Sequence, residues 1–429
     1  MTDRTLISHL FRRAAFGASG AEVDAATAAG FDKTVNSLLA GLGERDSGTP
    51  RPPRISSIEE INAGRAHDMY DEYTNLVAWW VEKMAFTPTP FREKLTLLLH
   101  GQFPTGFDKV GVPVYMYRQN EIFRTMGSGA FDTLTQALST DPSMLIWLDG
   151  GSNQRLSPNE NFAREVMERF TMGIGNYSQR DVREAARALT GWSVSYESGH
   201  FQFTIWDHDY GEKSFLGYHG DLAGQDIIQI VTHSAAAARW LPSRMWSFLA
   251  YPVGPGDSVV SDLAPSFHSD LNMTNLFRSI LTHPQFASTA ARQGLVKQPI
   301  EWVAGTMRAL NVRAASFKKR GGAGYLLNVL SNLGQIPFNP PTVGGWGNNE
   351  FWLSTASSLA QLDFANAVTE VADLSPISDA AGPSRAEALA DLLCVDGWSR
   401  ETLGTLQRVR DNVSELVALA LLSPEYIVN

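Results

Sequence analysis

Residues 157–192 read SPNENFAREVMERFTMGIGNYSQRDVREAARALTGW and predict two charged amphipathic helices in succession. In the first helix, apolar residues recur every four positions from Phe162 to Phe170, which is the spacing of one buried helix face. Ser157 and Glu160 have the spacing of a capping box, in which a serine and an acid three residues later satisfy each other's backbone N–H groups. We therefore expect the first helix to begin directly after Ser157.

The second helix has the same kind of start, because Ser178 is followed three residues later by Asp181. Gly191 predicts its end. If the two helices pack side by side, a basic face of the second has the acids of the first as ion-pair partners. A clamp for an anionic ligand is the alternative, since guanidinium groups suit carboxylate and phosphate. The basic face consists of Arg180, Arg183 and Arg187.

Helical spacing of apolar residues continues through most of the chain. It vanishes after Gly191, where FQFTIW at residues 201–206 alternates apolar and polar side chains and predicts a β-hairpin. We therefore expect a mainly α protein, a multi-helix globular body with a small β-hairpin insert around residues 192–216. The other expected helices cover residues 71–84, 91–99, 120–126, 130–139, 226–232, 235–250, 271–281, 299–310, 384–393 and 400–422.

Stretches rich in glycine, serine and proline divide the chain into three expected parts. Residues 1–45 form an N-terminal helical segment, and residues 55–370 form the main helical domain with the β insert. Residues 371–429 form a C-terminal helical segment that packs on the main domain. A chain of 429 residues can bury a large core without disulfides, and its one cysteine, Cys394, excludes an internal disulfide.

Composition and missing motifs exclude several classes of protein. The formal net charge of −10 disfavours a long polyanion, so we expect no nucleic-acid partner. No run of eighteen apolar residues occurs, so we expect no membrane span. The N-terminus lacks an apolar signal core, which predicts a cytoplasmic protein, or an exported one if a leader has been removed. Phosphate-loop, dinucleotide-binding, zincin and nucleophile-elbow motifs are all missing, and the oligomeric state is left open.

The first candidate group for chemistry is the set of acids on the first helix. Glu165 and Glu168 lie three residues apart, so both carboxyl groups can face one cleft and act as acid and base. Carboxylates at this spacing can also bind a metal ion. Arg164 beside them is a candidate to set the charge on the base and to contact substrate. The alternative is that these charges form only solvated pairs along the helix surface.

The second candidate group is the HDYGEK turn at residues 208–213. His208 is the candidate general base, because a histidine that titrates near neutral pH suits that role. Asp209 is the candidate carboxylate partner of Glu165, and Lys213 is a candidate substrate contact. An exposed, charged turn without catalytic function is the alternative. His100 follows an apolar helix and is expected either to orient a substrate or to interact with the helix dipole.

Three functions are compatible with these residues. The first is a carboxylate-based, glycoside-type hydrolase acting on a small molecule or saccharide, with Glu165 and Asp209 flanking the bond and Glu168 as substitute. Trp192 and Trp206 would then stack on sugar rings, although core packing is the commoner role of tryptophan. The second is a metal-binding or redox protein with His and Glu ligands: His100, His208, Glu165 and Glu168. The third is a non-enzymatic binding or assembly module. The sequence leaves the cofactor open.

Six sequence blocks occur in an order that points to a known family. They are HLFRRAAFG at 9–17, REKLT at 92–96, PSM at 142–144 with LD at 148–149, the NENFARE run to Trp192, HDYGEKSFLG at 208–217, and GQIPFNPP at 334–341 with GW at 345–346 and WL at 352–353. With these blocks the chain resembles, over about residues 5–370, the bacterial family catalogued as domain of unknown function 1800. The resemblance implies no particular reaction, because the family carries no settled activity.

Two positions depart from the pattern of that family. Members typically read HNHF where this chain has HGQF at residues 100–103, so Gln102 replaces a histidine. Some members also have a histidine where this chain has Phe170. The resemblance therefore does not support a metal site that depends on either imidazole. Many members carry export leaders, which neither shows nor excludes export here.

Overall fold

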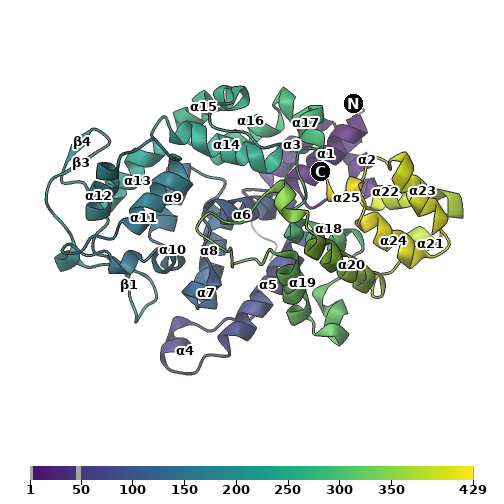
Figure 1. The fold of residues 1–429 in the computed structure, drawn as a ribbon, viewed down its shortest axis with the longest axis horizontal. Coiled ribbons are helices and arrows are strands. Elements are labelled where there is room, and N and C mark those ends of the chain that lie inside the picture. The colour runs from purple at the N-terminus through teal and green to yellow at the C-terminus, as the bar shows by residue number, and fades with distance from the viewer. Residues whose placement is uncertain (1–2, 45–49, 429) are drawn as a thin grey trace.

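The computed structural model describes residues 3–44 and 50–428 as a mainly helical protein with two small β-hairpins (Figure 1). Trp192–Val194 (β1) pairs with Phe201–Phe203 (β2), and Lys213–Phe215 (β3) pairs with Tyr218–Gly220 (β4), both antiparallel. The mainly α fold is confirmed. The β insert differs from the expected single hairpin, because the polar turn that contains the HDYGEK motif separates two independent hairpins.

The first half of the chain forms the N-terminal helices, the centre and the lobe at the left of Figure 1. Its helices are α1 (Asp3–Ala14), α2 (Gly20–Ala29), α3 (Phe31–Ala40), α4 (Ile58–Asn62), α5 (Met69–Phe86), α6 (Pro90–Gln102), α7 (Phe107–Val110), α8 (Pro113–Met126), α9 (Phe131–Ser139), α10 (Pro142–Trp147), η1 (Gly150–Ser152), α11 (Glu160–Glu165), η2 (Val166–Thr171), α12 (Gln179–Ala188), η3 (Ile205–Asp207) and α13 (Gly224–Thr232).

The second half returns across the top of the view and ends in the C-terminal helices at the right. Its helices are α14 (Ala237–Leu249), α15 (Ser258–Asp270), α16 (Met273–Leu281), η4 (Pro284–Ala287), α17 (Thr289–Arg292), α18 (Pro299–Ala309), η5 (Ala314–Arg320), α19 (Ala323–Leu333), η6 (Asn349–Trp352), α20 (Thr355–Thr369), α21 (Ser375–Ser378), η7 (Gly382–Ser384), α22 (Arg385–Leu392), α23 (Arg400–Arg408), α24 (Val413–Leu421) and α25 (Pro424–Ile427).

Two large apolar clusters form the core, and α6 contributes to both. Leu95 and Leu99 belong to the cluster that joins α6 to the left lobe and to α14–α16. Leu97 belongs to the other cluster, which joins α5, α18, α19, α20 and α24. Because α6 packs on both sides, nearly all of its side chains are buried, including the charged Arg92, Glu93 and Lys94. Figure 1 shows α6 near the middle of the molecule.

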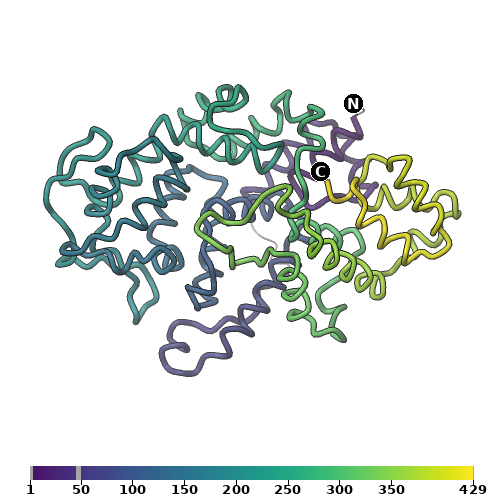
Figure 2. The backbone as a smooth tube through the Cα atoms, in the orientation of Figure 1, coloured from purple at the N-terminus to yellow at the C-terminus, as the bar shows by residue number. Residues whose placement is uncertain are grey.

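The N-terminal helix α1 lies against the C-terminal part of the chain, and Figure 2 shows these purple and yellow segments side by side. Arg4 pairs with Asp391 at 2.7 Å and Arg12 pairs with Asp396 at 3.0 Å. These contacts join segments that are almost 390 residues apart. No helix among the described residues is long and apolar enough to cross a membrane.

Expected helix boundaries are wrong at three places. The helix expected at residues 120–126 begins at Pro113. The helix expected at residues 400–422 is two helices, α23 and α24, because Asn412 accepts a hydrogen bond from the backbone N–H of Glu415 and starts a new helix. The first helix of the opening stretch begins at Glu160 and is capped by Asn159, not by Ser157. Ser157 instead closes a turn on Gln154.

Candidate functional site

The acids of the NENFARE motif lie where an α-helix changes into a π-helix. Glu165 is the last residue of α11, and Glu168 lies in η2, a six-residue π-helical segment. The Thr171 hydroxyl donates a 2.6 Å hydrogen bond to the carbonyl of Val166, five residues earlier, and supports the wider turn. Short π-helical segments inside helices are frequent at functional sites. The wider turn changes which side chains lie on the same face of the helix. The spacing of apolar residues every four positions does not reveal this wider turn in the sequence.

Glu165 is buried without a hydrogen-bond partner for one of its oxygens. The residue is 9% exposed, and no described residue makes a hydrogen bond to Oε2. Its nearest cation is Arg169, whose Nε lies 3.9 Å from that oxygen. Burial raises the pKa of the Glu165 carboxyl; Arg169 lowers it and Glu168 raises it by smaller amounts. A carboxyl group in such surroundings holds its proton at a higher pH than an exposed glutamate does.

Glu168 has different surroundings although it is only three residues away. The hydroxyl of Tyr177 donates a 2.8 Å hydrogen bond to Oε2, and the Nε of Arg169 lies 3.6 Å from Oε1. Burial and this hydrogen bond raise the pKa of Tyr177 to about 12, so the phenol keeps its proton. Arg169 is therefore a shared cation for both acids, and only one of the two has a hydroxyl donor.

A small polar cavity of about 70 Å³ adjoins this acid pair through Arg169. Gln102 donates from Nε2 to the carbonyls of Arg169 and Phe170, both at 3.1 Å, and accepts at Oε1 from the Nε of Arg244 at 3.2 Å. Burial, and to a smaller extent the charge of Arg169, lower the pKa of Arg244. The cavity is lined by Gly101, Gln102, Pro104, Arg169, Trp240, Arg244, Val343 and Gly344.

Trp240 also lines this cavity, and it is hydrogen-bonded to the π-helical segment. Its Nε1 donates a 3.0 Å hydrogen bond to the carbonyl of Arg169. Gly173 adopts a left-handed conformation (φ +78°), and a Cβ there would lie 2.6 Å from the Trp240 ring. The glycine is thus needed both for the turn and for the close approach of the indole. Sequence analysis singled out neither Trp240 nor Arg244.

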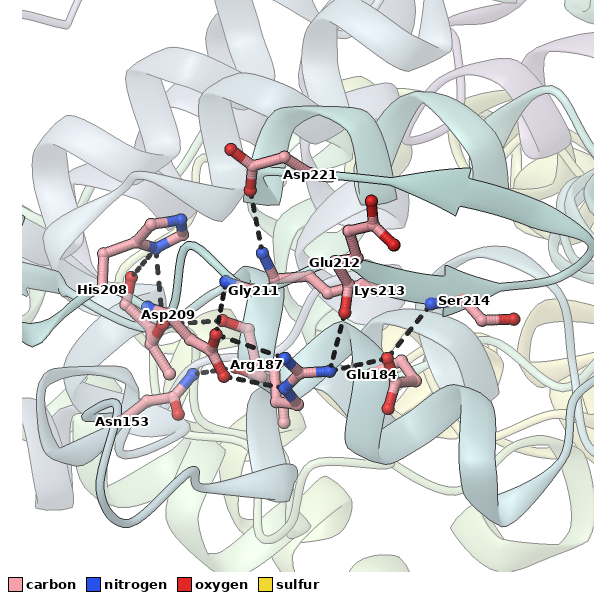
Figure 3. Close-up of polar contacts among 12 residues, drawn as sticks. Asn153, Glu184, Arg187, His208, Asp209, Gly211, Glu212, Lys213, Ser214 and Asp221 are labelled. Atoms are coloured by element: carbon pink, nitrogen blue, oxygen red, sulfur yellow. Dashed lines mark hydrogen bonds and ion pairs between the residues drawn. The ribbon is translucent and has the colours of Figure 1, made fainter.

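The HDYGEK turn packs on the C-terminal end of α12 (Figure 3). Asp209 accepts two hydrogen bonds from Arg187, at 2.7 and 3.2 Å, and a third from the N–H of Gly211 at 2.8 Å. The hydrogen bonds from Arg187 are the main cause of the lowered pKa of Asp209. Arg187 also pairs with Glu184 at 2.9 Å. Asp209 is therefore a charged structural partner of Arg187, which connects the turn to α12.

The neighbouring residues of the turn are buried and bonded locally. The Nδ1 of His208 lies 2.8 Å from the carbonyl of Thr190, to which it donates when protonated at that nitrogen. The Nζ of Lys213 lies 3.3 Å from the Oδ1 of Asp221, a pair also visible in Figure 3. Both His208 and Lys213 are less than 5% exposed. These contacts hold the turn in place.

The remaining candidates from the sequence lie in dissimilar environments. Arg164 bonds Glu160 at 2.9 Å and Gln179 at 3.0 Å on the helix surface. His100 is buried in the core, where its Nε2 accepts from the N–H of Phe338 at 3.0 Å and burial lowers its pKa to about 3. Trp192 is 2% exposed and packs in the core, whereas Trp206 is 71% exposed.

The structure thus places the sequence candidates in two separate groups. Glu165 and Glu168 share Arg169, and Asp209 pairs with Arg187. Helix α12 packs against both α11 and β3, yet within residues 3–44 and 50–428 no hydrogen bond or ion pair joins either glutamate to the turn. Of the basic face of α12, Arg187 pairs with Glu184 and Asp209 and not with these glutamates. Among the described residues, no three His, Cys, Asp or Glu side chains are placed to hold a metal ion.

Comparison with known proteins gives one match. A family model described as protein of unknown function (DUF1800) matches residues 9–428, which extends past residue 370 into the C-terminal helices. No curated protein and no solved structure matches the chain. Since the family model spans nearly the whole sequence, the chain belongs to the DUF1800 family of proteins of unknown function.

Proposed function

We propose that this chain is a carboxylate-based hydrolase of glycosidic or similar bonds, in which Glu165 donates the proton and Glu168 is the second carboxylate. The observation that carries the proposal is the buried Oε2 of Glu165, which has no hydrogen-bond partner among the described residues. Burial keeps this carboxyl protonated to a higher pH than usual, as a general acid requires. Glu168, three residues along, has a hydrogen-bond donor and partial exposure instead.

The second carboxylate is Glu168 rather than Asp209 in this proposal. Paired acids divide the roles of acid and base when their surroundings differ, and Glu165 and Glu168 differ in this way. Asp209 is engaged by both nitrogens of the Arg187 fork and by a backbone N–H, which leaves it poorly placed to attack or to accept a proton. His208 and Lys213 support the turn and have no part in the reaction.

Arg169 and Arg244 support a role for the neighbouring cavity in binding. Arg169 lies beside both acids and lines the cavity, and Arg244 lies over the ring of Phe248 at 5.1 Å. Among the described residues Arg244 has no carboxylate partner, and its one hydrogen bond goes to Gln102. Since the guanidinium of Arg244 has no acid partner in the described chain, it favours a substrate with a negatively charged or strongly accepting group.

The test is the variant Glu165→Gln in the full chain, assayed on a panel of 4-nitrophenyl glycosides that includes glucuronides. We expect the native chain to release nitrophenol from at least one of them and the variant to be slower by about 10²-fold or more. The rate should fall as the pH rises through the raised pKa of Glu165, since only the protonated acid donates. The melting temperature should change by only a few degrees.

A matched control is Glu160→Gln, which changes an acid on the same helix. Glu160 is partly exposed and pairs with Arg164 and Gln179, away from the acid pair, so its variant should keep full activity. The proposal is wrong if the native chain cleaves none of the panel, or if Glu165→Gln and Glu160→Gln have equal rates. If Glu165→Gln unfolds, Glu165→Asp serves instead, and unimpaired turnover by that shortened acid also contradicts the proposal.

A further inference from the structure

A second cavity, of about 310 Å³, lies where the N-terminal helices meet α18 and the C-terminal helices. Its walls come from the loop between α1 and α2, from the C-terminal half of α18, from the end of α22 and from α25. A volume of this order is that of a site for a small organic molecule. The ionisable side chains that line it are Glu22, Lys297, Arg308 and Tyr426.

The segment before α18 holds Lys297 against the C-terminal end of the chain. Its backbone N–H donates a 2.9 Å hydrogen bond to the carbonyl of Ile427, and the preceding Val296 forms a β-bridge with Val428. The amine reaches the cavity beside Tyr426, with Nζ 3.4 Å from the centre of the ring. Both the main chain and the side chain of Lys297 are thus positioned by α25 and the residue after it.

No acid in the described chain pairs with this amine. Glu301, one helical turn along α18, forms a close ion pair with Lys94 and also accepts from the N–H of Gln298. Glu22, across the cavity, bonds Arg308 at 2.7 Å and caps α2 through Ser19. The acids that face the cavity or flank it are therefore occupied by other groups.

The surroundings favour the neutral amine at physiological pH. Burial is the main cause that lowers the pKa of Lys297 to about 7, and the charges of Arg12 and Lys94 act in the same direction. Cys394 and Glu301 raise it by smaller amounts. The electron-rich face of Tyr426 also favours the ammonium form, but a ring contact replaces only part of the hydration that burial removes.

We propose that Lys297 is the nucleophile of a second site, at which the chain binds a small carbonyl compound and forms a Schiff base with it. The supporting geometry is an amine without an acid partner that lines a cavity of molecular size. Arg308 lines the same cavity and pairs with Glu22, but its guanidinium carries five N–H donors, more than its contacts with Glu22 and the carbonyl of Ala85 use. It can therefore also contact a carboxylate carried by the compound, which favours an α-oxo acid. This site does not depend on the hydrolase proposal, because it shares no residue with it.

The reaction needs no oxidant or reductant. The lone pair of the Lys297 nitrogen attacks the carbonyl carbon and forms a carbon–nitrogen bond, which gives a carbinolamine. The carbon–oxygen bond then breaks, and the oxygen leaves as water with the two protons that the amine carried. The product is an imine between Lys297 and the compound, and added water reverses each step.

The test traps this imine in the full chain. Glyoxylate and cyanoborohydride are added at pH 7, and the modified lysines are identified and quantified by peptide mass spectrometry. The exposed lysines Lys318 and Lys319 serve as internal references in the same sample. We expect Lys297 to be labelled at least about tenfold faster than either, because a far larger fraction of its amine is neutral at pH 7.

Two further results decide the proposal. Lys297→Arg keeps the positive charge but removes the nucleophile, so total labelling should fall to the level of the surface lysines. The rate at Lys297 should level off above about pH 7, whereas an amine with the ordinary lysine pKa of about 10.4 continues to gain reactivity as the pH rises. Labelling of Lys297 no faster than that of these references at pH 7 overturns the proposal, and this comparison in the native chain does not depend on the variant's folding.

Discussion

At the scale of single residues, the two proposed sites share one feature: an ionisable group, buried at Glu165 and partly buried at Lys297, whose natural partners are engaged elsewhere. Arg169 lies 3.9 Å from Glu165 but also serves Glu168, and Glu301 is paired with Lys94 and not with Lys297. A buried charge without a partner is costly, so each group shifts toward its neutral form. The neutral form is the proton donor for a carboxyl group and the nucleophile for an amine.

Gln102 differs from these two groups, because both its amide nitrogen and its amide oxygen make hydrogen bonds. The variant Gln102→Leu leaves two backbone carbonyls and the Nε of Arg244 without this partner. We expect it to lower the free energy of unfolding by about 1–3 kcal/mol, measured by urea denaturation. Gln136→Leu is the control, since its single hydrogen bond is at the surface, and it should change stability by less than about 0.5 kcal/mol. Equal effects would show that the Gln102 network contributes nothing.

At the scale of elements, the sequence predicts a helix cap correctly only where no other side chain bonds the capping residues. Ser178 and Asp181 form the expected capping box of α12. The same spacing at Ser157 and Glu160 predicted a capping box that does not form. Glu160 bonds Arg164 and Gln179 instead, and Asn159 caps the helix. The π-helical turn that separates Glu165 from Glu168 also escaped prediction, since it depends on packing.

Ser178→Ala and Ser157→Ala together test this difference. The first variant removes an N-cap that accepts from the N–H of Asp181, so we expect it to lower the free energy of unfolding by about 1 kcal/mol. The second removes a hydroxyl from an exposed turn outside the helix, and we expect no measurable change. Thermal unfolding of both variants beside the native chain gives the comparison. A larger loss from Ser157→Ala would mean that the helix begins where the sequence alone places it.

At the scale of the whole molecule, the helical class could be predicted and the placement of the sites could not. The mainly α fold follows from apolar spacing along the chain. The cavity near Glu165, however, takes Gln102, Arg169 and Arg244 from three helices that no local pattern connects. The cavity at Lys297 needs the N-terminal segment to meet the C-terminal helices, and Arg12 of α1 donates to the carbonyl of Cys394, 382 residues along the chain. Such long-range contacts depend on how the two apolar clusters pack about α6.

His100, near the end of α6, links those two clusters and makes the stability of the whole molecule depend on pH. Its ring contacts Phe123 of one cluster and Phe338 of the other, and burial lowers its pKa to about 3. In the unfolded chain the pKa of histidine is about 6.5, so between pH 6.5 and 3 the unfolded state binds the extra proton. Stability from this residue is therefore lost as the pH falls below 6.5, by up to about 1.4 kcal/mol per pH unit.

The variant His100→Gln should remove this dependence while its amide oxygen still accepts from the N–H of Phe338. Urea unfolding of the native chain and the variant at pH 7, 6, 5 and 4.5 measures the difference in the free energy of unfolding between them. We expect that difference to change in favour of the variant by about 1.4 kcal/mol for each pH unit below 6. Other titrating groups are common to both chains and cancel. Parallel pH profiles would mean that His100 binds a proton as readily in the folded chain as in the unfolded one, and that the packing between the two clusters is open to water.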